Sequence, residues 1–156
     1  MNRFRVPLYV ESEFSYGHDD NYLKLSLPEQ KSDLEHRLGD SKKIDSNIFK
    51  NRINILYIPY IFHDHETKFN FSIMTSNYSE SNLKSYNNYH FRFSQHLAPY
   101  TWLRFTYGYT PSFYIKSYSQ TDPYIIYDFE ENDYMPTLFS SEKIGIEFSA
   151  PIPYLN

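Results

Sequence analysis

The amino-acid sequence predicts an all-β protein, built as an antiparallel up-and-down meander. Polar and apolar residues alternate in at least five segments, with the period of two that side chains follow in a strand. Aromatic residues form 20% of the chain, with 17 Tyr and 13 Phe, and these residue types favour strands. Alanine occurs only at Ala98 and Ala150, so runs that favour helices are scarce.

The N-terminal third contains one clear strand pattern and one long polar stretch. The first predicted strand covers 4–16 and ends at the polar run 17–21. Residues 22–26 read as a short partner strand or as a continuation of the first one beyond a bend. The charged segment 27–50 has no alternation and predicts a long exposed loop, with one helical turn at 33–38.

The middle of the chain contains three further strand patterns. The second predicted strand covers 51–62 and is followed by a tight polar turn at 63–66. The third, 67–77, alternates most cleanly, with Phe and Ile opposite Lys, Asn and Ser. A polar loop at 78–84 precedes the fourth strand, 85–95.

The C-terminal third begins with a fifth strand that follows the turn 96–100 and extends to Lys116. Pro111 predicts a bend or bulge within it, because proline cannot donate to the ladder. A polar loop starts at 117, and weaker strand patterns cover 124–129 and 143–150. Short and long connections alternate along the chain, which predicts a meander with short turns at one end and long loops at the other.

Composition excludes several functional classes. The net charge of −4 gives no basic excess for a phosphate backbone, so nucleic acid is not an expected partner. The absence of cysteine excludes disulfides, thiolate metal sites and Cys nucleophiles. No stretch approaches the ~20 apolar residues of a spanning helix, although a β-barrel strand would escape that test. Residues 1–5 run into the first strand without a signal sequence, so an exported protein would be a mature form or part of a longer precursor.

The location of the apolar side chains decides between a dry core and a lipid-facing surface. The predicted strands run about 10–14 residues, which suits the ~9–11 residues that cross a bilayer at a tilt. Charged residues occupy strand middles, where a hydrated interior would accept them. Tyrosines lie near the ends of strands, where an interfacial aromatic girdle would form. They are Tyr16, Tyr22, Tyr78, Tyr86, Tyr100, Tyr114, Tyr124 and Tyr127.

In these features the chain resembles bacterial outer-membrane β-barrel proteins. The resemblance rests on the Tyr/Phe-rich alternating strands, the turn Gly17-His18-Asp19-Asp20-Asn21-Tyr22 after the first strand, and paired hairpins such as 85–116. It implies a transmembrane β-barrel, or part of one, formed by a single domain over 1–156, located in the bacterial outer membrane. The chain has only 4 Gly and ends in Pro151–Asn156 without a terminal aromatic residue, so we expect the front part of a larger barrel.

The two phases of the alternation predict two sets of residues. The polar phase is expected to line a pore or interior: Arg5, Glu11, Glu13, Arg52, Lys68, His90, Arg92, Arg104 and Glu147. The apolar phase is expected to face lipid: Phe69, Phe71, Ile73, Phe91, Phe93, Leu103 and Phe105. Both charge signs are mixed in the polar phase, so the sequence does not predict strong ion selectivity.

Other constellations give weak chemical signals. His63, His65 and Glu66 could chelate a metal, and the run 18–21 could bind calcium, but polar turns of this composition are common. Glu11 and Glu13 share a strand face and could form a catalytic carboxylate pair, or pair with Arg52 or Arg92 as ordinary charges. The chain has no nucleophile elbow and no Gly-rich phosphate loop. Neither enzymatic activity nor a metal or cofactor is therefore expected.

The expected function is that of an outer-membrane β-barrel protein with a structural role or passive, porin-like transport. The expected partners are outer-membrane lipid and small polar solutes. The alternative is a soluble β-sandwich or lipocalin-like module that binds carbohydrate or another small ligand. A hydrolase on a β scaffold would rest on Glu11 and Glu13 alone.

Overall fold

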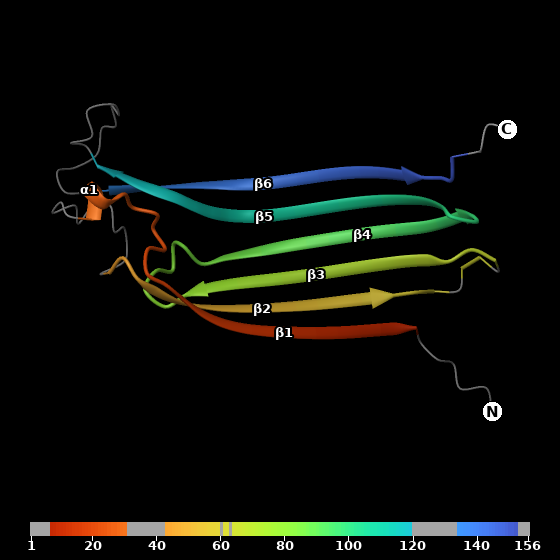
Figure 1. Ribbon diagram of the computed structural model, residues 1–156, viewed down its shortest axis with the longest axis horizontal. Coiled ribbons are helices and arrows are strands. Elements are labelled where there is room, and N and C mark those ends of the chain that lie inside the picture. Colours follow the sequence, from red (N-terminus) through yellow and green to blue (C-terminus); the bar gives the residue numbers. More distant parts are fainter. Residues whose placement is uncertain (1–6, 31–42, 60, 63, 120–133, 153–156) are drawn as a thin grey trace.

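The structure is a single antiparallel sheet whose six strands lie in chain order (Figure 1). It is a computed structural model, and it describes residues 7–30, 43–59, 61–62, 64–119 and 134–152. The strands are β1 (Leu8–Asp19), β2 (Ser46–Tyr57), β3 (Thr67–Tyr78), β4 (Tyr86–Ala98), β5 (Thr101–Ser119) and β6 (Tyr134–Ser149). The predicted all-β antiparallel meander is confirmed. The sheet is open, with β1 and β6 at its two edges.

Strand positions agree best where the alternation is clearest. β3 and β4 lie within a few residues of their predicted bounds, whereas β2 starts at Ser46 and ends at Tyr57. The prediction of a loop through residue 50 was wrong because 46–50 pair with the second half of β1, from Ser15 to Asp19. β5 continues to Ser119 instead of ending at Lys116, and β6 begins at Tyr134 instead of 143.

Three other predicted elements have different outcomes. Residues 22–26 do not form a strand: Tyr22 and Leu23 are buried at one end of the sheet, just before the short helix α1 (Leu27–Gln30). The predicted helical turn at 33–38 and the predicted strand at 124–129 lie outside the described residues. No helical segment in the described ranges has the length or apolar character of a membrane-spanning helix.

The register places side chains of like character on the same face of the sheet. Phe69 pairs with Phe93 and Phe71 with Phe91, and Phe93 in turn pairs with Phe105. Because directly paired residues share a face, these pairings extend the same apolar rows across the strands. We call this surface the apolar face. It carries Leu8, Val10, Phe14, Tyr16, Phe49, Ile53, Ile55, Tyr57, Phe69, Phe71, Ile73, Tyr89, Phe91, Phe93, Leu103, Phe105, Tyr107, Tyr109, Ile144, Ile146 and Phe148.

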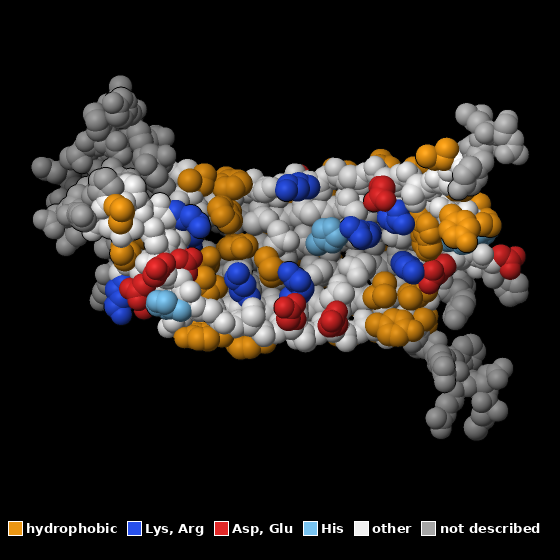
Figure 2. Space-filling model, in the orientation of Figure 1, with side chains coloured by type: hydrophobic (Ala, Val, Ile, Leu, Met, Phe, Trp, Pro, Cys, Tyr) orange, Lys and Arg blue, Asp and Glu red, His pale blue; other side chains and the backbone are white. Residues whose placement is uncertain are grey.

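The opposite surface, the polar face, carries the other phase. Figure 2 shows charged side chains gathered along the middle of this face, with hydrophobic side chains nearer its ends. Its strand residues are Glu11, Glu13, Arg52, Asn54, Lys68, Asn70, Ser72, His90, Arg92, Ser94, Arg104, Thr106 and Glu147.

Among the described residues, the buried hydrophobic core is small and lies at one end of the sheet. It consists of Tyr22, Leu23 and Tyr114, against which Leu25, Tyr78 and Leu83 pack; we call these six residues the end cluster. The apolar face has no comparable cover in the described part of the chain: Val10 is 65% exposed and Ile146 76%.

The loop after β1 is held over the end of the sheet by Asn21. Its side-chain amide donates to the Leu25 carbonyl at 2.8 Å, and its side-chain oxygen accepts from the Leu25 backbone N–H at 2.9 Å. Asp19 accepts a further bond from the Asn21 backbone N–H, and the Tyr22 N–H donates to the carbonyl of Ile44. The polar run after β1 therefore positions Tyr22 and Leu23 for burial.

A bulge in β5 adds aromatic side chains near this end. The register against β6 shifts between Thr110 and Phe113, which confirms the irregularity predicted at Pro111. Unbroken alternation would put Phe113 on the apolar face with Tyr109. Instead its ring lies 5.3 Å from the rings of Tyr86 and Phe139, and Tyr86 belongs to the polar phase of β4.

The connections gather at two ends, but the predicted division into short turns at one end and long loops at the other is wrong, because 58–66 is longer than 79–85. β1–β2, β3–β4 and β5–β6 connect at one end, on the left of Figure 1, and β2–β3 and β4–β5 connect at the other. The β4–β5 connection is only Pro99-Tyr100. The β2–β3 connection, 58–66, is longer than the predicted turn because β2 ends at Tyr57.

Replacing Tyr22 by Ala should destabilise the end cluster. The Tyr22 side chain is 1% exposed and its ring lies 5.5 Å from that of Tyr78, so truncation should cost roughly 3–5 kcal/mol. Amide hydrogen exchange should show faster exchange across 20–27 and 79–85. Leu27→Ala is the control, because Leu27 is 71% exposed and should change little. Equal effects of the two substitutions would contradict this account of the core.

Candidate functional site

The residues predicted to line an interior are brought together on the polar face. Glu11, Glu13, Arg52, Lys68, His90, Arg92, Arg104 and Glu147 all point to this side of the sheet. Arg5 lies outside the described residues. The residues predicted to face lipid lie together on the apolar face. The placement of the two sets on opposite faces follows the predicted phases, while the roles of interior and lipid contact stay predictions.

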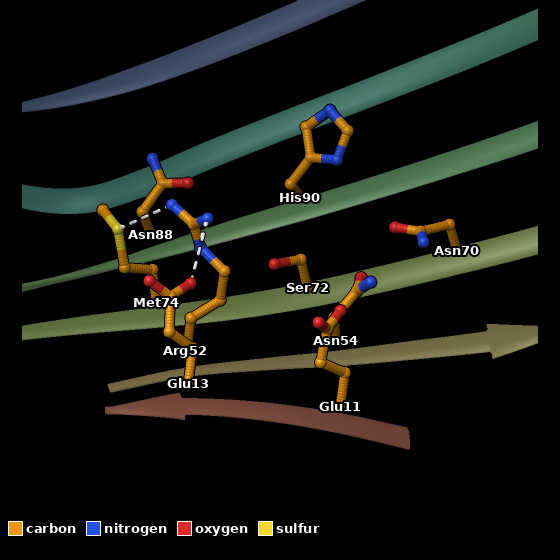
Figure 3. A pocket seen from close by; sticks show the side chains of 9 residues that line it. All are labelled: Glu11, Glu13, Arg52, Asn54, Asn70, Ser72, Met74, Asn88 and His90. Carbon is orange, nitrogen blue, oxygen red and sulfur yellow. Dashed lines mark hydrogen bonds and ion pairs between the residues drawn. The ribbon is translucent and has the colours of Figure 1, made fainter. Parts of the chain in front are cut away.

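The polar face is hollowed above β1–β4. A hollow of about 510 Å³ is lined by Glu11, Glu13, Arg52, Asn54, Asn70, Ser72, Met74, Asn88 and His90 (Figure 3). Within it, the Arg52 guanidinium lies 3.6 Å from the Glu13 carboxylate and donates to the Met74 sulfur at 3.7 Å. The Arg52 and Glu13 side chains are more than half exposed. Water therefore screens their ion pair, which contributes at most about 1 kcal/mol.

A second hollow, of about 370 Å³, lies over β2–β5, and its charged lining residues are positive. It is lined by Leu56, Lys68, Asn70, His90, Arg92, Ser94, Trp102 and Arg104, with no carboxylate among these residues. We call it the basic hollow. Ser94 on β4 is paired with Lys68 on β3 and with Arg104 on β5, so the three residues form one row across the strands. Ser94 is 6% exposed.

Two carboxylates contact the basic hollow from outside. The Glu66 carboxylate lies 3.0 Å from the Lys68 ammonium. The Glu147 carboxylate accepts from Arg104 at 2.6 Å, and Ser149 accepts a further bond from the same nitrogen at 3.2 Å. Arg92 is different: in the described part of the chain its side chain has no ion pair or hydrogen bond.

The Trp102 ring contacts Lys68 and Arg104, the two cations of the basic hollow that have carboxylate partners. The Lys68 ammonium lies 5.1 Å from the centre of the Trp102 ring and the Arg104 guanidinium 5.6 Å, within the range of cation–π attraction. The Trp102 ring also contacts the His96 ring, with ring centres 4.9 Å apart. Sequence reasoning missed Trp102 as a site residue, although it shares the phase of Arg104 on β5.

Between β5 and β6 the polar face is shaped by glycine. Gly108 and Gly145 lie on neighbouring strands beside Thr106, which pairs with Gly145. A Cβ at Gly145 would lie 2.6 Å from the Thr106 hydroxyl oxygen, so this position has no room for a side chain without movement of Thr106. A third hollow, of about 350 Å³, extends over this part of the face.

The polar face ends at the loop before β4, where Lys84 covers aromatic rings. Its ammonium lies 5.8 Å from the Phe113 ring centre and 5.4 Å from that of Tyr114. Burial lowers the pKa of Lys84, the positive charge of Lys24 lowers it further, and Asp19 partly offsets both. Lys84 therefore packs on the aromatic rings at this end of the sheet and does not line the basic hollow.

The weaker predicted constellations do not gather into a metal-binding group in the described residues. No group of three His, Asp or Glu side chains there is arranged to hold a metal. His18 contacts Asn47 at 3.1 Å and Asp45 at 3.9 Å, and Asp19 and Asn21 are engaged in the loop described above. His63 lies outside the described residues, and the His65 ring contacts the His96 ring edge to face, with ring centres 5.7 Å apart. Glu13 of the predicted carboxylate pair is paired with Arg52.

Gly145→Ala should destabilise the β5–β6 pair. The added methyl group meets Thr106, whose branched side chain has few alternative rotamers, and overpacking of this kind costs about 1–3 kcal/mol. Unfolding in urea should report the loss. Thr106→Ala in the same chain should restore most of it, and Gly17→Ala should be nearly neutral because a Cβ there has no neighbour within 4 Å. No rescue by Thr106→Ala would contradict the contact.

Comparison with known proteins gives no family for this chain. No protein-family model, no curated protein and no solved structure matches it. The function is therefore argued from the two faces of the sheet.

Proposed function

We propose that this chain forms part of a β-barrel in a bacterial outer membrane, with a structural role or passive, porin-like transport. The apolar face contacts lipid and the polar face lines a hydrated interior. One observation carries the proposal: an uncovered apolar face that spans six strands lies opposite a hollowed, charged face.

The exposure of the apolar face is the first support. On the edge strands Phe14, Ile144 and Phe148 are 69%, 68% and 64% exposed, and on the middle strands Ile53, Phe71 and Leu103 are each 37% exposed. The apolar rows continue across all six strands. Soluble monomers rarely expose apolar patches above about 300–600 Å². Lipid removes the cost, because hydrocarbon tails replace water around these side chains.

The dimensions of the apolar face also suit a bilayer. From Leu103 to Tyr109 on β5, the apolar rows span six residue steps, or about 20 Å along the strand. On β1 the same face continues from Leu8 to Tyr16, about 27 Å along the strand. Membrane barrels carry an apolar band about 25 Å tall. On β3 and β4 the band ends at Thr75 and Asn87, whereas on β2 Phe49 continues it beyond Asn51 and contacts Tyr16.

The interfacial tyrosines agree only in part with the predicted girdle. Tyr16 and Tyr100 are 60% and 83% exposed at opposite ends of the sheet. Tyr100 has a φ of 59°, a left-handed conformation that costs a non-glycine residue about 1–2 kcal/mol. The girdle prediction was wrong for Tyr22 and Tyr114, which are buried in the end cluster, and Tyr124 and Tyr127 lie outside the described residues.

The soluble alternative fits the described residues less well. A lipocalin-like barrel encloses an apolar ligand cavity, whereas the hollows over the middle strands are lined mainly by charged and polar residues. A β-sandwich needs a second sheet over the apolar face, and the described strands form one sheet. In the proposed barrel, further strands would continue the sheet beyond β1 and β6, because usual membrane barrels have at least about eight.

The first test is the behaviour of the full chain in solution. Because the apolar face needs a hydrocarbon environment, we expect extraction from membranes only with detergent. In unheated electrophoresis samples the folded barrel should migrate differently from the boiled protein. A chain that stays monomeric and folded in buffer without detergent would refute the proposal.

The second test places a charge on each face of β3. Phe71→Arg puts the charge on the apolar face and should cost about 2–4 kcal/mol if that face lies in lipid near mid-bilayer. Ser72→Arg, one residue along on the polar face, should cost far less. Reversible folding into liposomes in urea measures both. Equal costs, or a greater cost for Ser72→Arg, would contradict the assignment of the faces.

A further inference from the structure

We infer that the basic hollow is a binding site for a small multivalent oxyanion, of the phosphate or polycarboxylate class. The site is formed by Lys68, Arg92 and Arg104 around the buried Ser94, with His90 and Trp102 beside them. The site uses the polar face alone, so it does not depend on what covers the apolar face.

The arrangement of cations around Ser94 is the first argument. Lys68 and Arg104 lie on either side of Ser94 in one row, so their backbones are two strand spacings apart, about 9–10 Å. Arg92 lies on the same face of the same strand as Ser94, about 7 Å along it. Because Ser94 is short, the three long side chains surround an open space and not a filled one.

The charge of this space is the second argument. The chain carries a net charge of −4, yet the side chains that line the basic hollow include three permanent cations and no carboxylate. Glu66 and Glu147 pair with Lys68 and Arg104 from the rim, so Arg92 is the cation of the basic hollow that has no carboxylate partner among the described residues. An anion bound beside Arg92 would be attracted by this charge. The hollow over β1–β4 differs, because Glu11 and Glu13 oppose Arg52 there.

The state of the individual cations is the third argument. Trp102 contacts Lys68 and Arg104, so both heads are positioned before any ligand arrives, which lowers the entropy cost of binding. Arg92 has no side-chain partner in the described part of the chain, and a guanidinium has five donors that match an oxyanion in a bidentate geometry. Glu66 and Glu147 compete for the other two cations from the rim.

The polar face therefore separates its charges by strand. Glu11 and Glu13 lie on β1, and the cations of the basic hollow lie on β3–β5. Both charge signs fall on one phase of the alternation, so the sequence pattern predicts no selectivity. The register separates them, because it gathers Lys68, Arg92 and Arg104 on β3–β5 and leaves Glu147 at the rim beside Arg104.

Trp102 is the only tryptophan of the chain, so its fluorescence reports directly on the site. The full chain, in the buffer or non-ionic detergent that keeps it monodisperse, is titrated with inorganic pyrophosphate and separately with citrate at constant ionic strength. We expect a saturable change with at least one of them, and the tighter ligand identifies the phosphate or the polycarboxylate class. No saturable change with either would overturn the inference.

Three variants test the location of the site. Arg92→Gln should weaken binding about tenfold or more, since it removes a charge-assisted hydrogen-bond donor. Lys143→Gln removes the same charge from the polar face outside the basic hollow and should change binding less than about twofold. Glu147→Gln frees Arg104 and should tighten binding. Equal weakening by Arg92→Gln and Lys143→Gln, or weaker binding by Glu147→Gln, would show diffuse attraction and refute the site.

Discussion

The whole arrangement depends on the register between neighbouring strands. Side chains alternate with a period of two, so a slip of one residue would move an entire strand's apolar set to the other face. Here five successive antiparallel pairings keep the phases aligned, from Leu8 opposite Tyr57 at one edge to Phe105 opposite Ile146 at the other. The apolar face, the polar face and the basic hollow all exist because no pairing in the middle of the sheet slips.

Buried hydrophobic side chains are concentrated at one end of this sheet. The described residues bury few hydrophobic side chains, and those form the end cluster, at the end of the sheet where β1 connects to β2. Over the rest of the sheet, contacts such as Phe69 with Phe93, at 5.3 Å between ring centres, run sideways along the apolar face. The ladder and these lateral contacts cannot remove that face from water, so the proposed lipid contact would supply the missing burial.

The sequence was sufficient to predict the sheet because alternation is a local signal. It identified β3 and β4 closely and assigned the charged and apolar residues to opposite faces. It failed where tertiary contacts decide: residues 46–50 become strand by pairing with β1, and Tyr22 is buried because Asn21 holds its loop. The basic hollow was equally hidden, since Lys68, Arg92 and Arg104 come from three strands and only register brings them around Ser94.

The absence of native cysteine allows a direct measurement of which face meets lipid. Single cysteines at successive positions from Lys68 to Met74 on β3 are spin-labelled in the chain folded into liposomes. Collision with lipid-soluble oxygen and with a water-soluble nickel chelate is then compared at each position. We expect oxygen to dominate at 69, 71 and 73 and the chelate at 68, 70, 72 and 74. Preference for the chelate at 69, 71 and 73, or no period of two, would contradict the account.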